Sequence, residues 1–457
     1  MKKKVALLIA SAIALASLSG CGGSGAATPA GTTAGSTAAG STAAETTKAA
    51  AGDESGKLKL TMSWWGNQVR NEKTQAALDL YTEQNPGTVI EGQFSEWSDY
   101  WNKLATSAAG QAIPDIVQMD YSFIDQYVKN GLLVDLTPYI KDGTLDVSNI
   151  SDNTMASGTV NGGVYAVCAG INAPSLLYNK TLLDKNGIVV KDYMTTDEFI
   201  DLCREVYKKT GYKTNIAYYN AGAFLDYFMR GNDVVLYGDK KMGGEEKDYL
   251  PFFQMYETGI KEGWFIDPGV FAELSIGSVE QEPLVYGSSP ETMSWCAFYN
   301  SNQLTAMQKA APEGMEIGIT TWPSADPKKS GYLKSSQFFS VGAHSKNPEE
   351  AVKVINFLTN SSDANNILLG ERGVPASSKI ASELAPKMSD VEQKVIHYVN
   401  EVVTPNCSPI NPPQPDGASE VSNLLNQVQE QVCYSVYDAE TAAKEFYNGA
   451  NEIMSKK

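Results

Sequence analysis

Histidine is scarce in this chain of 457 residues. The two histidines, His344 and His397, stand more than fifty positions apart. Zinc sites usually draw on several histidines or cysteines, and activated nucleophiles often need a histidine beside a serine or cysteine. The sequence therefore argues against both kinds of chemistry, and we predict no cofactor and no metal-binding residues.

Cysteine is also scarce, and its number defines no disulfide framework. Cys21 ends an N-terminal apolar run, and the five others are Cys168, Cys203, Cys296, Cys407 and Cys433. An odd number without a Cys-x-x-Cys pair requires no bridge and forms no zinc ribbon. A Cys407–Cys433 disulfide stays open as an alternative to free buried thiols.

Positive charge is outnumbered by negative charge. The chain has 36 Lys and Arg against 53 Asp and Glu, a net charge of −17. A field of this sign repels phosphate backbones, so we predict no nucleic-acid partner. The 42% share of hydrophobic residues excludes global disorder, and the length favours two domains.

The N-terminus has the pattern of an export signal. Three lysines precede an apolar run over residues 5–18, which is shorter than the ~20 residues that span a bilayer. The run ends in Leu18-Ser19-Gly20-Cys21, which resembles a bacterial lipobox. We therefore predict a lipoprotein signal peptide over residues 1–21, with lipid attached to Cys21.

Residues 22–56 lack Val, Ile, Leu, Met, Phe, Trp, Tyr and Cys altogether. Such a segment cannot bury a core, and its Ala, Gly, Ser and Thr content is typical of a disordered linker. We predict that the folded part of the chain begins at residue 57.

From residue 57 onward, predicted strands alternate with helices. Residues 57–64 alternate strictly in hydrophobicity, which predicts a strand, and residues 67–84 have helical spacing. Strands at 88–94 and 116–119 follow, each with a helix after it. This order indicates an α/β lobe with a largely parallel sheet.

Capping and breaker residues mark several later elements. Thr195 and Glu198 form a capping box ahead of a helix over 199–208, and Asn347-Pro348 begins another helix. Five prolines between 405 and 415 predict an extended loop before terminal helices over 419–454.

Several segments together resemble the extracellular solute-binding proteins (family 1) of ABC sugar importers, the group that includes maltose-binding protein. In chain order they are 113–120 (IPDIVQMD), 131–140 (GLLVDLTPYI), 165–167 (YAV), 177–180 (LYNK), 293–295 (MSW), 351–358 (AVKVINFL) and 372–376 (RGVPA). The resemblance implies a two-lobed α/β fold of the periplasmic-binding-protein type II, with three hinge crossings near 168–171, 336–341 and 378–388. The implied lobes are 57–168 with 338–385, and 169–337 with 386–457.

The resemblance also implies a carbohydrate ligand in the cleft between the lobes. A sugar has apolar C–H faces and a rim of hydroxyls, so its site needs flat aromatic rings and polar groups. Trp65, Trp97 and Trp295 stand at predicted element ends, and Trp264 lies in a turn. We predict that all four contact the ligand, with packing in the core or in a loop as the alternative.

Four further residues are predicted to bind the sugar's polar rim. Asp120 follows the third strand and Tyr121 comes next, where a helix cap is the alternative role for Asp120. Asn172 and Arg372 are candidates from loops; Arg372 either clamps hydroxyls or pairs with Glu371.

The predicted function is therefore a membrane-tethered receptor, expected to be monomeric. It captures a mono- or oligosaccharide and delivers it to an ABC permease, without being an enzyme. Two alternatives remain at this point: a secreted glycoside hydrolase with paired carboxylates, and a sugar sensor that signals through a membrane protein.

Overall fold

The computed structural model describes residues 56–66, 68–95, 97–218, 220–275 and 278–456. The predicted signal peptide, Cys21 and all but the last residue of the predicted linker lie outside the described residues. No described helix combines the length and apolar character that crossing a membrane requires.

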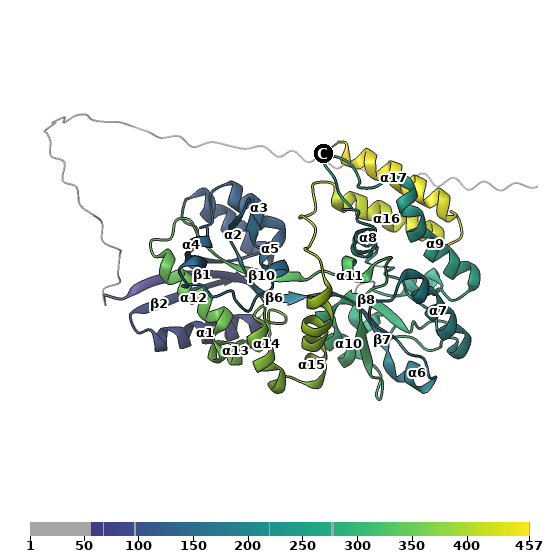
Figure 1. The fold of residues 1–457 in the computed structure, drawn as a ribbon, viewed down its shortest axis with the longest axis horizontal. Helices are drawn as coiled ribbons and strands as arrows, with labels where there is room; N and C mark the ends of the chain where they lie inside the picture. The colour runs from purple at the N-terminus through teal and green to yellow at the C-terminus, as the bar shows by residue number, and fades with distance from the viewer. Residues whose placement is uncertain (1–55, 67, 96, 219, 276–277, 457) are drawn as a thin grey trace, which may run out of the picture. The chain divides into compact units, whose positions relative to one another are not determined.

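One of the two larger sheets has five strands in the order β2-β1-β3-β10-β6 (Figure 1). Strand β1 pairs in parallel with β2 and β3, whereas β10 runs antiparallel to β3 and β6. Parallel strands end at the same edge of a sheet, so the segments after β1 and β3 are neighbours. The strands are Leu58–Trp65 (β1), Thr88–Ser95 (β2), Ile116–Met119 (β3), Val167–Asn172 (β6) and Lys334–Val341 (β10).

Helices pack on this sheet and on one another. They are Gln68–Gln84 (α1), Trp97–Ala109 (α2), Tyr121–Lys129 (α3), Thr137–Lys141 (α4), Asp152–Ala156 (α5), Pro348–Asn360 (α12), Ser362–Leu368 (α13) and Ser378–Leu384 (α14). A two-stranded hairpin, Thr159–Val160 (β4) with Gly163–Val164 (β5), precedes β6. The strand–helix alternation predicted from residue 57 to residue 131 is confirmed, and β3 has the predicted bounds.

A second, antiparallel sheet has the order β8-β7-β9. Its strands are Pro174–Asn179 (β7), Cys296–Asn300 (β8) and Ile317–Thr320 (β9). The helices around it are Lys180–Lys185 (α6), Thr196–Thr210 (α7), Ala221–Arg230 (α8), Glu246–Glu262 (α9), Leu304–Ala310 (α10), Pro327–Ser330 (α11), Asp390–His397 (α15), Ala418–Cys433 (α16) and Ala439–Met454 (α17). Helices α9, α16 and α17 lie side by side in Figure 1 and contact one another.

Several further helices are short. The 3-10 helices are Pro268–Glu273 (η1), Val279–Gln281 (η2), Ser301–Gln303 (η3), Ala385–Lys387 (η4) and Thr404–Asn406 (η6), and a π-helix, Tyr398–Val403 (η5), continues α15. Residues 407–415 form a loop outside any helix or strand, as the prolines predict, because proline fixes φ and lacks an N–H donor.

The chain changes sheets at Ala173, between β6 and β7, and returns between β9 and β10. These positions lie a few residues outside the predicted crossings at 168–171 and 336–341. Pairing explains the difference: residues 167–172 and 334–339 pair with each other within the first sheet, which their sequence alone does not reveal. The lobe boundaries at 168, 338 and 385 stay a prediction.

Two hydrophobic cores hold the described residues together. The first surrounds the five-stranded sheet and reaches one face of the second sheet, where it includes Leu177 and Tyr299. The second lies on the opposite face and includes Leu176 and Phe298. Alternating side chains of β7 and β8 thus enter different cores, as the two-residue period of a strand requires.

Local signals read from the sequence recur in the structure. The Thr195–Glu198 capping box opens α7, with both reciprocal hydrogen bonds formed. The five described cysteines are all free, so the Cys407–Cys433 bridge is absent from this structure.

Candidate functional site

An aromatic cluster lies at the carboxyl end of β1. The ring of Trp65 meets that of Trp97 edge-on at a centroid distance of 4.9 Å, and Trp101 packs 5.5 Å from Trp97. Trp65 is only 9% exposed, whereas Trp97 is 43% exposed. The cluster therefore holds Trp97 in place and leaves part of its indole open to solvent, which suits stacking against a sugar.

Asp120 and Tyr121 follow β3 at the same edge of the sheet. The Asp120 carboxylate caps α3 by accepting a hydrogen bond from the Ser122 N–H at 2.9 Å. The Tyr121 hydroxyl donates to the Asn411 carbonyl at 2.9 Å, which connects α3 to residues 407–415, the proline-rich segment. Burial raises the pKa of Tyr121, so its hydroxyl remains a donor at neutral pH.

A cavity of about 660 Å³ opens beside Tyr121, and we call it the α3–α8 cavity. It brings together residues attached to both sheets: α3 supplies Tyr121 and Ser122, and α8 supplies Ala223 and Asp226. The remaining lining residues are Val235, Tyr237, Gly238, Tyr332, Lys334 and residues 410–419. Its mixture of aromatic rings, carboxylates and amides can bind both the faces and the hydroxyls of a sugar.

Asp226 and Arg230 form a polar centre that the sequence analysis missed. Asn411 donates to Asp226 Oδ1 at 2.8 Å and accepts from Arg230 at 2.7 Å. Burial raises the pKa of the Asp226 carboxyl, and the Asn411 hydrogen bond and the Arg230 charge oppose that rise. Opposite charges one turn apart inside an otherwise apolar helix were the available signal.

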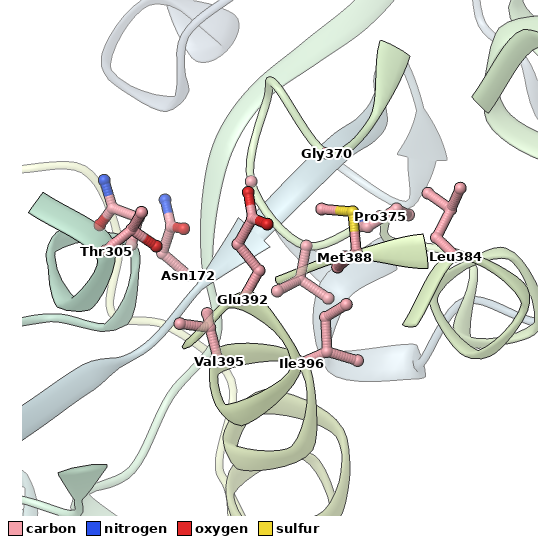
Figure 2. A pocket seen from close by; sticks show the side chains of 12 residues that line it. Asn172, Thr305, Gly370, Pro375, Leu384, Met388, Glu392, Val395 and Ile396 are labelled. Atoms are coloured by element: carbon pink, nitrogen blue, oxygen red, sulfur yellow. The ribbon is translucent and has the colours of Figure 1, made fainter. Parts of the chain in front are cut away.

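A smaller cavity, of about 100 Å³, includes Asn172, and we call it the Asn172 cavity (Figure 2). Figure 2 shows Thr305 near Asn172, with Met388, Pro375 and Leu384 toward the other end. The Asn172 Oδ1 atom is buried and has no hydrogen-bond partner among the described residues. Asn172 does not line the α3–α8 cavity, so the structure separates it from Tyr121.

Two predicted tryptophans are core residues instead of ligand contacts. Trp295 has no exposed surface, and its indole N–H donates to Thr214 Oγ1 at 2.8 Å. Trp264 is 1% exposed and donates to Glu262 at 2.8 Å. Both rings lie in the second core, because the strand end and the turn that carry them pack inward. Neither offers a ring face to a ligand here.

Arg372 is likewise placed in the interior. Its guanidinium donates to Gln118 at 3.1 Å and to Thr74 at 2.9 Å, and lines neither cavity. Burial, followed by the nearby charge of Arg70, lowers the pKa of Arg372 to about 9. Glu371 makes its shorter ion pair with Arg70, at 2.7 Å, and a longer one with Arg372, at 3.9 Å. The predicted pairing of Arg372 with Glu371 is therefore present, and the buried guanidinium braces the interior.

Other depressions and clusters are less suited to a site between the sheets. Hollows of about 730 and 560 Å³ are lined by residues 267–292 and 424–452, respectively. Within the described ranges, no group of three or more His, Cys, Asp and Glu residues is arranged to hold a metal ion.

Comparisons with known proteins identify a family for this chain. A family model described as bacterial extracellular solute-binding protein matches residues 76–394. A curated carbohydrate ABC transporter substrate-binding protein of Streptococcus pneumoniae is 27% identical over 168 residues. That match spans 35% of this chain and 33% of the relative, so the chain aligns with about a third of that protein's length.

Solved structures extend the likeness to nearly the whole described fold. An extracellular solute-binding protein (family 1) from Alicyclobacillus acidocaldarius has 26% identity and a TM-score of 0.79, covering 87% of this chain and 99% of that one. An oligogalacturonide-binding protein from Yersinia enterocolitica has 20% identity and a TM-score of 0.71, with the same coverage.

Proposed function

Because the chain belongs to the bacterial extracellular solute-binding proteins, we propose that it binds a carbohydrate in the α3–α8 cavity and delivers it to an ABC permease. The carrying observation is the composition of that cavity, which combines tyrosine rings with carboxylate and amide groups from both sides. Such a combination fits the two kinds of surface that a sugar presents.

Within this proposal, Tyr121 contacts the mono- or oligosaccharide directly from the wall of the α3–α8 cavity. Trp97 does not line that cavity and stacks on the saccharide where it extends beyond the lining residues. Trp65 supports the Trp97 ring, and Asp120 fixes the start of the helix that carries Tyr121. Asn172 contacts a ligand only where that ligand reaches the Asn172 cavity.

The test is a thermal-shift screen of the purified protein against a broad panel of glycans. A ligand that binds only the folded state raises the melting temperature by mass action. Calorimetric titration of the best ligand should then give one site per chain. If no saccharide raises the melting temperature, the proposed function fails.

We also propose that the sugar leaves the site unchanged. The rival glycoside hydrolase would release dye from chromogenic glycosides, and the screen's best ligand would be cleaved on prolonged incubation. The signalling alternative keeps the same site but replaces the permease by a sensor protein. Co-purification of permease subunits with the tagged protein from membranes supports import.

Export and tethering complete the proposal. The family is extracellular, and the lipobox ending in Cys21 supports a lipid anchor on the outer face of the cytoplasmic membrane. The Cys21→Ala protein should lose labelled fatty acid and membrane association while keeping its melting temperature. Sedimentation of the soluble form should give the mass of a monomer.

A further inference from the structure

Asp226 carries a carboxylate oxygen that the folded chain leaves unused. Its Oδ1 atom accepts from the Asn411 side chain at 2.8 Å, and Oδ2 has no hydrogen bond within the described residues. The residue lines the α3–α8 cavity, and after burial its charge helps to raise the pKa of Tyr237, another lining residue, to about 12. One acceptor atom of this cavity-lining residue is thus left without a hydrogen-bond partner among the described residues.

The buried Arg230 positions Asn411 and, through it, Asp226. Its guanidinium donates to the Ser330 carbonyl at 3.0 Å, to Asn411 Oδ1 at 2.7 Å and to the Pro409 carbonyl at 2.9 Å. These bonds fix the segment that carries Asn411, and Asn411 in turn orients Asp226. Arg230 is buried and does not line the cavity, so its donors serve the protein and not a ligand.

The charges on the residues that line the cavity are predominantly negative, although the buried Arg230 behind Asp226 offsets part of the Asp226 charge. Asp226 and Asp416 are its carboxylates, and Lys334, which is exposed at the first position of β10, is its single cation among the described residues. A second carboxylate brought beside Asp226 would meet like-charge repulsion in a partly desolvated site.

Building on the function proposed above, we propose that Asp226 accepts a hydrogen bond from a sugar hydroxyl and that the site therefore selects neutral saccharides over acidic ones. A hydroxyl donor satisfies the free Oδ2 atom with a charge-assisted hydrogen bond. A uronic acid places its own carboxylate near the same atom. Selectivity then arises from repulsion of the wrong ligand as well as from attraction of the right one.

The decisive measurement compares neutral and acidic glycans on the unaltered protein by calorimetric titration. The probes are neutral disaccharides and trisaccharides from the stabilising panel, and digalacturonic acid. We expect binding of a neutral probe and at least tenfold weaker binding of digalacturonic acid at pH 7. Equal or tighter binding of digalacturonic acid overturns the selectivity but leaves the proposed carbohydrate function intact. Failure of every saccharide removes both.

The Asp226→Asn variant tests the residue itself. The amide can still accept from Asn411 but presents an N–H donor to the cavity, so neutral-sugar affinity should fall about tenfold to a hundredfold. Binding of digalacturonic acid should rise, which a purely structural role would not produce. Unchanged affinity for both probes assigns the hydroxyl contact elsewhere and overturns the proposal.

Asp239→Asn is the matched control, because it removes an exposed carboxylate that does not line the α3–α8 cavity. It should change neutral-sugar affinity by less than about threefold. An effect as large as that of Asp226→Asn would assign the selectivity to total charge in place of a hydrogen bond. Melting curves of both variants establish that each is folded, and the unaltered protein decides the selectivity even if one is not.

Discussion

Trp97 and Trp295 show how burial assigns roles to similar side chains. Trp97 is held edge-on by Trp65 and Trp101 with much of its surface exposed, whereas Trp295 is enclosed beside Phe199 of α7. An exposed, supported ring can stack on a ligand, and an enclosed ring can only stabilise the fold.

This difference predicts opposite effects of two alanine substitutions. Trp97→Ala should weaken sugar binding about tenfold to a hundredfold, through loss of one large apolar contact, with little change in melting temperature. Trp295→Ala should cost about 3–5 kcal/mol of unfolding free energy, because it leaves a cavity and removes the indole N–H that donates to Thr214 Oγ1. The folded fraction should keep its affinity. Calorimetry measures the affinity and denaturant melts measure the stability of both variants. A large stability loss in Trp97→Ala together with a large affinity loss in Trp295→Ala would contradict these assignments.

Glu282 is a buried acid whose hydrogen bonds are satisfied within the second sheet region. Its carboxylate oxygens accept from Asn215 at 2.9 Å and from Tyr299 at 3.1 Å. Burial nevertheless raises its pKa to about 7 from the usual 4.5, with both hydrogen bonds opposing the rise. The folded protein therefore holds this proton over a pH range in which the unfolded chain has released it.

Glu282→Gln should accordingly change the pH dependence of stability. Between about pH 4.5 and 7 the folded state binds the extra proton, so the Glu282 contribution falls as pH rises and then levels off. Relative to the original protein, the variant should gain up to roughly 3 kcal/mol from pH 4.5 to pH 8, at about 1.4 kcal/mol per pKa unit. Urea melts at these two pH values measure the difference, and a pH-independent difference contradicts the assignment.

Among the elements, α7 illustrates how much a local signal determines. Thr195 Oγ1 accepts from the Glu198 N–H at 3.3 Å, and Glu198 Oε2 accepts from the Thr195 N–H at 2.9 Å. Phe199, Leu202, Cys203 and Val206 are buried along one face. The cap and the periodicity are read from neighbours along the chain, which is why the sequence predicts this helix well.

Thr195→Ala should lower the unfolding free energy by about 1 kcal/mol, because the Glu198 N–H at the start of α7 loses its acceptor. The midpoint of urea unfolding measures the loss. Thr195→Ser retains the hydroxyl acceptor and should remain close to the original protein. A loss of equal size in both variants would locate the effect in the methyl group and not in the cap.

The proline-rich segment is the element whose role the sequence did not reveal. The absence of helix and strand in this segment follows from its prolines, but its contacts are with residues far away in the chain. The carbonyl of Asn411 accepts from Tyr121, 290 positions earlier, and its side chain joins Asp226 to Arg230. The segment therefore forms part of the α3–α8 cavity and connects α3 with α8.

At the scale of the whole molecule, the two sheets and the family match confirm the predicted α/β solute-binding fold. In such a protein a ligand that touches both sides of a cavity binds the closed state better and shifts the population toward it. Saturation with the best saccharide should therefore reduce the radius of gyration measured by small-angle scattering. A saccharide that gives no thermal shift is the control, and an unchanged radius at saturation argues for a site attached to one sheet alone.

The sequence by itself determined the elements and, through its ordered motifs, the family. Period-two alternation predicted β1, β3 has its predicted bounds, and the capping box predicted α7, because each depends on residues adjacent in the chain. Only the tertiary structure decided which aromatic and charged side chains meet in a cavity. Trp295 and Arg372 became interior residues and Asp226 a cavity residue because burial depends on packing between distant segments, which local patterns do not encode.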